Sequence, residues 1–188
     1  MTIALSWGAV GEAGGTKSQK PEPSSEKFML KVIGQLAAAR EAFCPADTNL
    51  FGFSGDVFGE DDDPVADDPI GVYDACVQSF TCNPFDGGGT AQLNARFVLD
   101  DGTISVTCTC YPTLSAKAPE VDGNVLFSFT SGVGSITGAD GAYTGATSES
   151  SVIGAGESEL AFDSASPIGM IPVRERAFFY LNLQFDED

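Results

Sequence analysis

Hydrophobic and polar residues alternate with a period of two along much of the chain after residue 50. The clearest segments are residues 91–99, 103–111 and 177–185, in which every second side chain is apolar. This period is typical of strands in a sheet with one buried face. The first two segments flank the turn sequence Asp100-Asp101-Gly102, which is typical of a β-hairpin. We therefore predict antiparallel strands whose apolar sides face a common interior.

Shorter β patterns, separated by turn residues, continue on both sides of this hairpin. They predict strands at residues 50–58, 70–82, 124–130, 132–137, 148–153 and 157–162. About seven to nine strands at this spacing favour a closed barrel, with a sandwich as the alternative. The fold class that we predict is all-β, with a single eight-stranded antiparallel barrel.

The region before the barrel has a different pattern. Apolar residues recur at helical spacing at Phe28, Met29, Val32, Ile33, Leu36, Ala39 and Phe43. This predicts a helix over residues 25–43, which Pro45 ends. We therefore divide the chain into a flexible arm (1–23), an amphipathic helix (24–45) and a barrel domain (46–188). The helix either covers a cavity as a lid or packs against the barrel wall.

Charge and composition exclude several classes of function. Lys and Arg total 9 against 27 Asp and Glu, a net charge of −18. Such a chain does not bind nucleic acid or an anionic membrane surface by the usual electrostatic route. The absence of His excludes a Ser-His-Asp or Cys-His site. No stretch is apolar for the ~18 residues that a membrane span needs, and residues 1–15 lack the basic start of a secretory signal. We expect a cytoplasmic protein.

The five cysteines do not have the spacing of a zinc site. We expect them to be reduced and mostly buried; the alternative is one disulfide that joins Cys108 or Cys110 to Cys76 or Cys82. The acidic run at residues 61–63 lacks the ligand spacing of a calcium loop. No metal and no other cofactor is expected.

The predicted strand at 70–82 carries polar candidates for chemistry. If Cys76 points inward, its face is shared by Val72, Asp74, Gln78 and Phe80. An inward Asp74 would have a raised pKa because burial disfavours its charged form. The two faces of this strand are not clearly separated, so an outward Asp74 remains open.

The segment Ser135-Ile136-Thr137-Gly138-Ala139-Asp140-Gly141-Ala142-Tyr143-Thr144-Gly145-Ala146 resembles a signature of allene oxide cyclase-like and dirigent-like barrels. In that family a strand ends in a Thr-Gly pair, and a tight turn with spaced glycines leads to the return strand. The resemblance covers roughly residues 49–186. It implies an eight-stranded, oligomeric barrel with an apolar cavity that cyclises or couples hydrophobic substrates without a cofactor.

The family has distinct branches, and the match is closer to one of them. The plant enzymes carry a Glu and an Asn on the first strand, where this chain offers only Ser54 and Asp56. The expected helix before the barrel resembles the lids of bacterial ring-forming members. Cys76 corresponds loosely to a cavity-lining Cys of the plant enzymes, or is a small buried hydrophobe. The resemblance therefore points to the bacterial polyketide cyclase branch.

The expected function is a cyclase that folds a polyene or polyketide in an apolar cavity and accelerates an intramolecular [4+2] cycloaddition. The alternatives are a cyclopentenone-forming isomerase and a barrel that binds an apolar ligand without catalysis. The candidate catalytic residues are Asp74, Gln78 and Asp56. The candidate substrate-binding residues are Val72, Cys76, Phe97, Ile104, Val106, Cys108, Phe127, Phe129, Leu181 and Leu183. The expected partners are a hydrophobic small molecule and a second copy of the chain, which would contact outward Phe178 and Tyr180.

Overall fold

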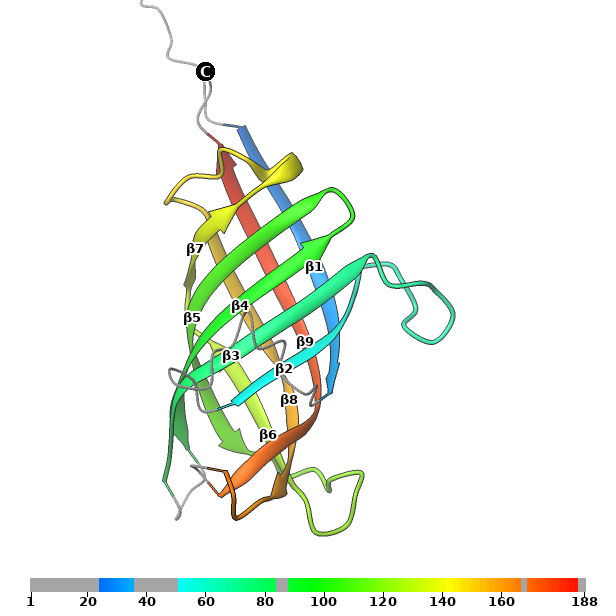
Figure 1. Cartoon of the computed structure of the whole chain (residues 1–188), viewed down its shortest axis with the longest axis vertical. Coiled ribbons are helices and arrows are strands. Elements are labelled where there is room, and N and C mark those ends of the chain that lie inside the picture. The colour runs from blue at the N-terminus through cyan, green and yellow to red at the C-terminus, as the bar shows by residue number, and fades with distance from the viewer. Residues whose placement is uncertain (1–23, 36–50, 84–87, 167–168, 186–188) are drawn as a thin grey trace, which may run out of the picture.

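The computed structural model describes residues 24–35, 51–83, 88–166 and 169–185 (Figure 1). Within these ranges the chain forms strands and one short 3-10 turn, η1 (Gly141–Tyr143). The strands are β1 (Ser24–Gln35), β2 (Phe51–Phe58), β3 (Gly71–Cys82), β4 (Gly89–Leu99), β5 (Gly102–Leu114), β6 (Val125–Ser131), β7 (Gly134–Ala139), β8 (Ser151–Phe162) and β9 (Met170–Phe185). The prediction of an all-β, antiparallel fold is confirmed.

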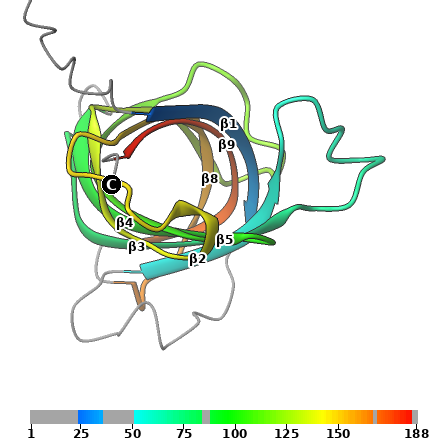
Figure 2. The same ribbon diagram turned by 90° about the horizontal axis from the view of Figure 1, so that it is seen from above.

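The nine strands form one sheet that closes into a ring (Figure 2). Strands β1 to β5 pair in chain order, and β9 closes the ring by pairing with both β8 and β1. Strands β6 and β7 share one position, because β5 pairs with β7 along its first half and with β6 along its second half. The ring therefore has eight strand positions, an even number, which allows the observed antiparallel pairing of every neighbouring pair.

The period of two decides which side chains fill the ring. On β5 the buried residues alternate as Ile104, Val106, Cys108 and Cys110. On β9 the buried series is Ala177, Phe179, Leu181 and Leu183. The side chains between them face outward. Because successive side chains of a strand point to opposite faces of the sheet, these buried series identify the face that lines the interior of the ring.

The predicted helix is wrong in its described part, because residues 24–35 form strand β1. The apolar side chains of this segment also fit the strand period of two, at Phe28, Leu30 and Val32. The segment therefore satisfies both the helical and the strand pattern. Each residue from Ser24 to Gln35 pairs with β9, and the end of β1 pairs with β2. This pairing closes the ring, so tertiary hydrogen bonding decides between the two patterns. The rest of the predicted helix and the predicted arm lie outside the described residues.

The glycine-rich segment at residues 135–146 covers one end of the ring. Its Tyr143 is buried, its hydroxyl donates a hydrogen bond to Oδ1 of Asp101 at 2.7 Å, and its ring lies 5.9 Å from that of Phe28. Gly141 has a φ of 62°, and a Cβ there would approach the Asp101 carbonyl oxygen to 2.3 Å. The glycine therefore lets the turn lie directly on the β4–β5 hairpin.

Three aromatic rings fill the middle of the interior. The centroids of Tyr73, Phe97 and Phe179 lie 5.2 to 5.4 Å apart in pairs. A Cβ at Gly154 on β8 would come within 2.7 Å of the Phe179 ring. Gly154 on β8 therefore leaves space for the Phe179 ring of the neighbouring strand β9.

The cysteines differ from the expectation of uniformly reduced thiols. Cys76 is disulfide-bonded, whereas Cys108 and Cys110 are free. Because both of these thiols are free, the alternative disulfide that would join one of them to Cys76 or Cys82 is wrong. A disulfide is a bond that cytoplasmic proteins rarely keep.

In the described part of the chain no helix is long and apolar enough to cross a membrane.

Candidate functional site

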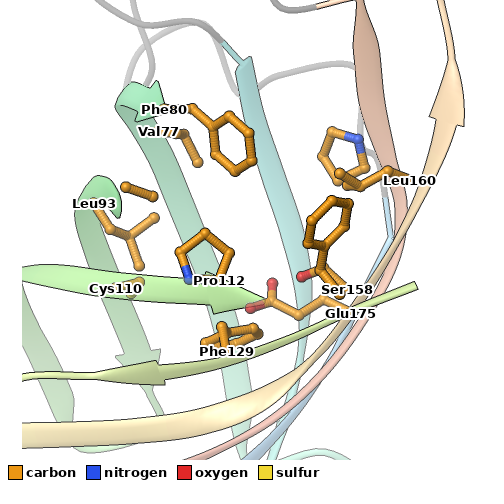
Figure 3. A pocket seen from close by; sticks show the side chains of 12 residues that line it. Val77, Phe80, Leu93, Cys110, Pro112, Phe129, Ser158, Leu160 and Glu175 are labelled. Atoms are coloured by element: carbon orange, nitrogen blue, oxygen red, sulfur yellow. The ribbon is translucent and has the colours of Figure 1, made fainter. Parts of the chain in front are cut away.

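A cavity of about 70 Å³ lies inside the ring at the end away from Tyr143 (Figure 3). It is formed by the late parts of β3, β5 and β8, the early parts of β4 and β9, and strand β6. The lining residues are Val77, Phe80, Ala91, Leu93, Cys110, Pro112, Phe127, Phe129, Ser158, Leu160, Pro172 and Glu175. The wall is therefore almost wholly apolar, with a carboxyl, a thiol and a hydroxyl as its polar side chains.

A β-bulge on β3 shapes the cavity mouth. The register between β3 and β4 shifts between Val77 and Ser79, so Gln78 is the extra residue. Because of this shift, Val77 and Phe80 both face inward although they are three residues apart. The Phe80 ring meets the Phe127 ring edge-on at 6.4 Å. The bulge thus adds an aromatic wall that strict alternation would turn outward.

Glu175 places a carboxyl group in this apolar setting. It lies on the inner face of β9, two residues before Ala177, and is only 3% exposed. Its Oε2 atom has no hydrogen-bond partner among the described residues. Burial, and then the neighbouring Cys108, raise the pKa of this carboxyl well above its usual value. A neutral carboxylic acid is therefore the form that this environment favours.

Two thiols and a phenol lie close to this carboxyl. The sulfur atoms of Cys108 and Cys110 are 3.8 Å apart on the inner face of β5, and either can donate a hydrogen bond to the other. This hydrogen bond lowers the pKa of Cys108, while the same contact and burial raise the pKa of Cys110. Burial raises the pKa of Tyr73, followed by the charges of Glu175 and the two thiols. The four groups therefore form one electrostatically coupled cluster.

This cluster suits hydrogen-bond and proton chemistry in a dry site. A neutral acid in an apolar cavity donates a strong hydrogen bond to a ligand oxygen, because water does not compete for it. Within the described residues, no three His, Cys, Asp or Glu side chains are grouped closely enough to hold a metal ion. The cavity therefore offers a carboxylic acid as a hydrogen-bond donor in apolar surroundings.

No family model, curated protein or solved structure matches this chain. The residues themselves therefore carry the functional argument.

The three candidate catalytic residues do not lie at the cavity. Tyr73 faces inward, so Asp74 lies on the outer face of β3, where it is 2% exposed. It forms an ion pair with Arg96 at 2.7 Å and accepts a hydrogen bond from the Ser54 hydroxyl at 2.8 Å. Asp56 is exposed on the outer face of β2, and Gln78 is exposed at the bulge. The structure thus assigns Asp74 to a polar contact between β2, β3 and β4.

The candidate substrate-binding residues divide into three groups. Val72 and Cys76 share the outer face of β3 with Asp74. Phe97, Ile104, Val106, Leu181 and Leu183 lie in the filled part of the interior, and Cys108 lies between that part and the cavity. Phe127 and Phe129 line the cavity itself. Of the predicted residues, Phe127 and Phe129 therefore line the cavity, and Cys108 belongs to the polar cluster.

Glu175 is the important residue that sequence reasoning missed. The predicted strand began at residue 177, whereas β9 begins at Met170. Continuing the inward series of Phe179 and Ala177 by one step reaches Glu175, which is a charged residue on an apolar face. That break in the pattern was the available signal.

Proposed function

We propose that this protein is a cofactor-independent cyclase for a hydrophobic, carbonyl-bearing polyene, with Glu175 as the acid that activates the carbonyl. The observation that carries the proposal is the buried Glu175 carboxyl at the wall of an apolar cavity, whose Oε2 atom has no hydrogen-bond partner among the described residues. Asp74, the first candidate from the sequence, is not proposed for this role because its side chain lies on the outer face of β3. An intramolecular [4+2] closure is the reaction that we favour.

The chemistry requires little from the protein. In a [4+2] closure, a hydrogen bond to the carbonyl of the electron-poor alkene withdraws electron density and lowers the barrier. Holding the two reacting ends close together supplies the other part of the acceleration. A neutral Glu175 donates that hydrogen bond, and the aromatic and aliphatic wall holds the hydrocarbon. No covalent intermediate is needed for this reaction.

Cavity size restricts how a substrate binds. About 70 Å³ is less than the ~150 Å³ cavity that admits benzene and the ~300 Å³ or more of most ligand pockets. We therefore place only the activated carbonyl end in the cavity as it stands. The rest of the polyene lies towards the mouth beside Phe80 and Phe127, where rotation of these rings widens the space.

The resemblance to allene oxide cyclase-like barrels gives independent support. Such barrels enclose an apolar cavity and cyclise hydrophobic molecules without a cofactor, as proposed here. An eight-stranded barrel of that family is the specific fold to which we assign the ring. In this chain the segment that carries the resemblance covers one end, and the polar cluster lies towards the other.

A second copy of the chain is the other partner that we propose. Phe178 and Tyr180 alternate with the inward residues of β9 and are 51% and 42% exposed. Ile153, which is opposite Tyr180 on β8, is also exposed. Adjacent apolar side chains on a sheet face are typical of a protein interface.

Binding of a small aldehyde tests the hydrogen bond from Glu175. The probe is 4-(dimethylamino)benzaldehyde, whose absorption moves to longer wavelength when its carbonyl accepts a hydrogen bond. We expect this shift with the wild-type protein and with E175Q, which keeps a donor, but not with E175M, which has a similar size and no donor. The analogue N,N-dimethyl-p-toluidine, which lacks the carbonyl, should bind E175M at least as well as wild type. An equal shift in E175M would contradict the proposal.

Catalysis is separated from binding with a synthetic linear triene that carries a conjugated ester. Chromatography should show faster ring closure with wild-type protein than in buffer, and a loss of about 10-fold or more in E175M. If the aldehyde binds as expected but no triene in a series of chain lengths closes faster, the protein is a ligand-binding barrel and not a cyclase.

A further inference from the structure

A groove lies on the outer face of the sheet, over β1, β9, β8 and β6. Its volume is about 670 Å³, which is within the range of about 300–1,000 Å³ that ligand pockets occupy. Two loops border it, the β2–β3 loop with Pro64 and the β5–β6 loop with Lys117. The β2–β3 loop stands out from the wall of the ring (Figure 2). The groove is therefore large enough for a ligand that the cavity inside the ring does not hold.

The strand register produces the apolar floor of this groove. Phe178 on β9 is paired with Lys31 on β1 and with Ala155 on β8, so these three outward side chains form one row across the sheet. The adjacent row consists of Ile33, Arg176 and Glu157. Phe178 and Ile33 are 51% and 38% exposed. Because Ala155 is small, the surface is hollowed beside the Phe178 ring.

Positive charge is concentrated along the groove. Three of the nine Lys and Arg residues of the chain line it, against one carboxylate among the described residues. These side chains are Lys31, Lys117, Arg176 and the acidic Glu157. Arg176 shares the Glu120 carboxylate with Arg174, so one negative charge serves two guanidinium groups. Lys31 donates a hydrogen bond to the main-chain carbonyl oxygen of Asp62 at 2.6 Å. The groove therefore carries local positive charge on a chain whose net charge is −18.

We propose that this groove binds a single-chain amphiphile with one negative charge, namely a long-chain fatty acid. The hydrocarbon lies along Phe178, Ala155 and Ile33, and the carboxylate accepts hydrogen bonds from Lys31 and Arg176. These two cations are diagonal neighbours across β1 and β9, a separation that long side chains span. The site goes beyond the proposed cyclase, since it uses neither Glu175 nor a cyclisation reaction.

The charge of the whole chain selects a ligand with a single negative charge. At −18 the protein repels polyanions, which include acidic proteins and anionic membrane surfaces. A single carboxylate pays little for this long-range repulsion and meets the cations of the groove at short range, where salt screens least. The long hydrocarbon then supplies most of the affinity, about 0.8 kcal/mol for each CH₂ group that it buries.

The groove adjoins the proposed dimer contact, because Phe178 belongs to both. Tyr180 and Ile153 form the next row of the sheet, on the side of Phe178 away from Arg176. The variants that test the groove therefore leave Phe178 unchanged.

Calorimetric titration of the full-length protein with octanoate, decanoate and dodecanoate, each below its micellar concentration, tests the proposal. The affinity should rise about 2- to 4-fold per added CH₂ group. K31Q and R176Q should each lower the affinity for decanoate about 5-fold, because each removes one charged donor. Neither should change the affinity for 1-decanol, which has no charge. The matched control is K27Q, because Lys27 is exposed on the same face of β1 and lies outside the groove.

A155W fills the floor of the groove. It should lower the affinity for both decanoate and 1-decanol by about 10-fold or more, with a far-UV circular dichroism spectrum like that of wild type. Wild-type decanoate binding in A155W, or equal affinities in K31Q and K27Q, would overturn the proposal. Decanoate binding in Y180S but not in wild type would show that a second copy covers the groove and would also overturn it.

Two further outcomes separate this site from its rivals. The protein should not sediment with phosphatidylglycerol vesicles, and sedimentation that K31Q abolishes would assign the groove to a membrane surface instead. The expected shift of the aldehyde probe without any binding of decanoate would refute the groove site and leave the cyclase proposal intact.

Discussion

The two halves of the ring's interior are built from the same strands but differ in how completely they are filled. From the middle of the ring towards Tyr143 the interior is filled: the rings of Tyr73, Phe97 and Phe179 meet, and Gly154 gives Phe179 room. In the other half, the wall is apolar but leaves a cavity, and Glu175 has no hydrogen-bond partner for its Oε2 among the described residues. The filled half supplies stability, and the half with the cavity holds the groups of the proposed chemistry.

This contrast explains why an energetically costly group is tolerated. A buried carboxyl without a partner destabilises a fold, and such strain is typical of functional sites. The closed ring and its filled half stabilise the strand positions on which Glu175 and Cys110 depend. The strands that carry the proposed site are therefore held in place by the packed part of the interior.

The largest difference between the halves should appear on truncation of aromatic rings. We expect F179A to lower the free energy of unfolding by about 3–5 kcal/mol, because it leaves a void among close-packed rings. F127A should cost less than half as much, since that ring already borders a cavity. Urea unfolding measures both values. Equal losses would contradict the difference in packing.

Two glycines of the segment at residues 135–146, which covers one end of the ring, form a matched pair for testing steric overlap. Both Gly141 and Gly145 have positive φ angles, of 62° and 92°. A Cβ at Gly145 meets no atom within 4 Å, whereas at Gly141 it meets the Asp101 carbonyl oxygen. G145A should cost about 1–2 kcal/mol from backbone strain alone, and G141A about 1–3 kcal/mol more from overlap. Thermal unfolding tests the order, and a G145A variant less stable than G141A would refute it.

The pH dependence of stability should report on Glu175. Its folded-state pKa lies above the ordinary value of 4.5, so between these two pKa values the folded state binds more protons than the unfolded state. The contribution of Glu175 to stability is then fully present below pH 4.5 and is lost as the pH rises through the folded-state pKa. E175Q should match wild type at pH 4 and become more stable than it at higher pH, by up to about 1.4 kcal/mol per pH unit. A difference that does not change with pH would refute this protonation behaviour.

The smallest effect on folding is expected on the outer face. Replacement of Phe178 and Tyr180 by Ser should change the stability of a single chain by about 0.5 kcal/mol or less, because both are exposed. If they form the proposed interface, light scattering should show a dimer for wild type and a monomer for the variant. A monomeric wild-type protein would exclude the proposed dimer.

Local periodicity was sufficient to predict most strands but not the site. The segments at residues 91–99 and 103–111 were predicted almost as they occur, because strict alternation reports a buried face directly. Residues 25–35 fitted both a helix and a strand, and only pairing with the distant β9 decides between them. The bulge at Gln78 is also a feature of strand pairing, and it reverses which residues of β3 reach the cavity. The candidate site therefore depended on contacts that a single sequence does not specify.

The protonation state of Glu175 at neutral pH tests the central claim most directly. Infrared spectra of the wild-type protein and of E175Q, recorded in heavy water at pH 7, should differ by the carbonyl stretch of a protonated carboxylic acid, present only in the wild type. Adding the aldehyde probe should move this band to lower frequency, because the acid then donates a hydrogen bond. A difference spectrum that contains only carboxylate bands would show that Glu175 is ionised and would contradict the account.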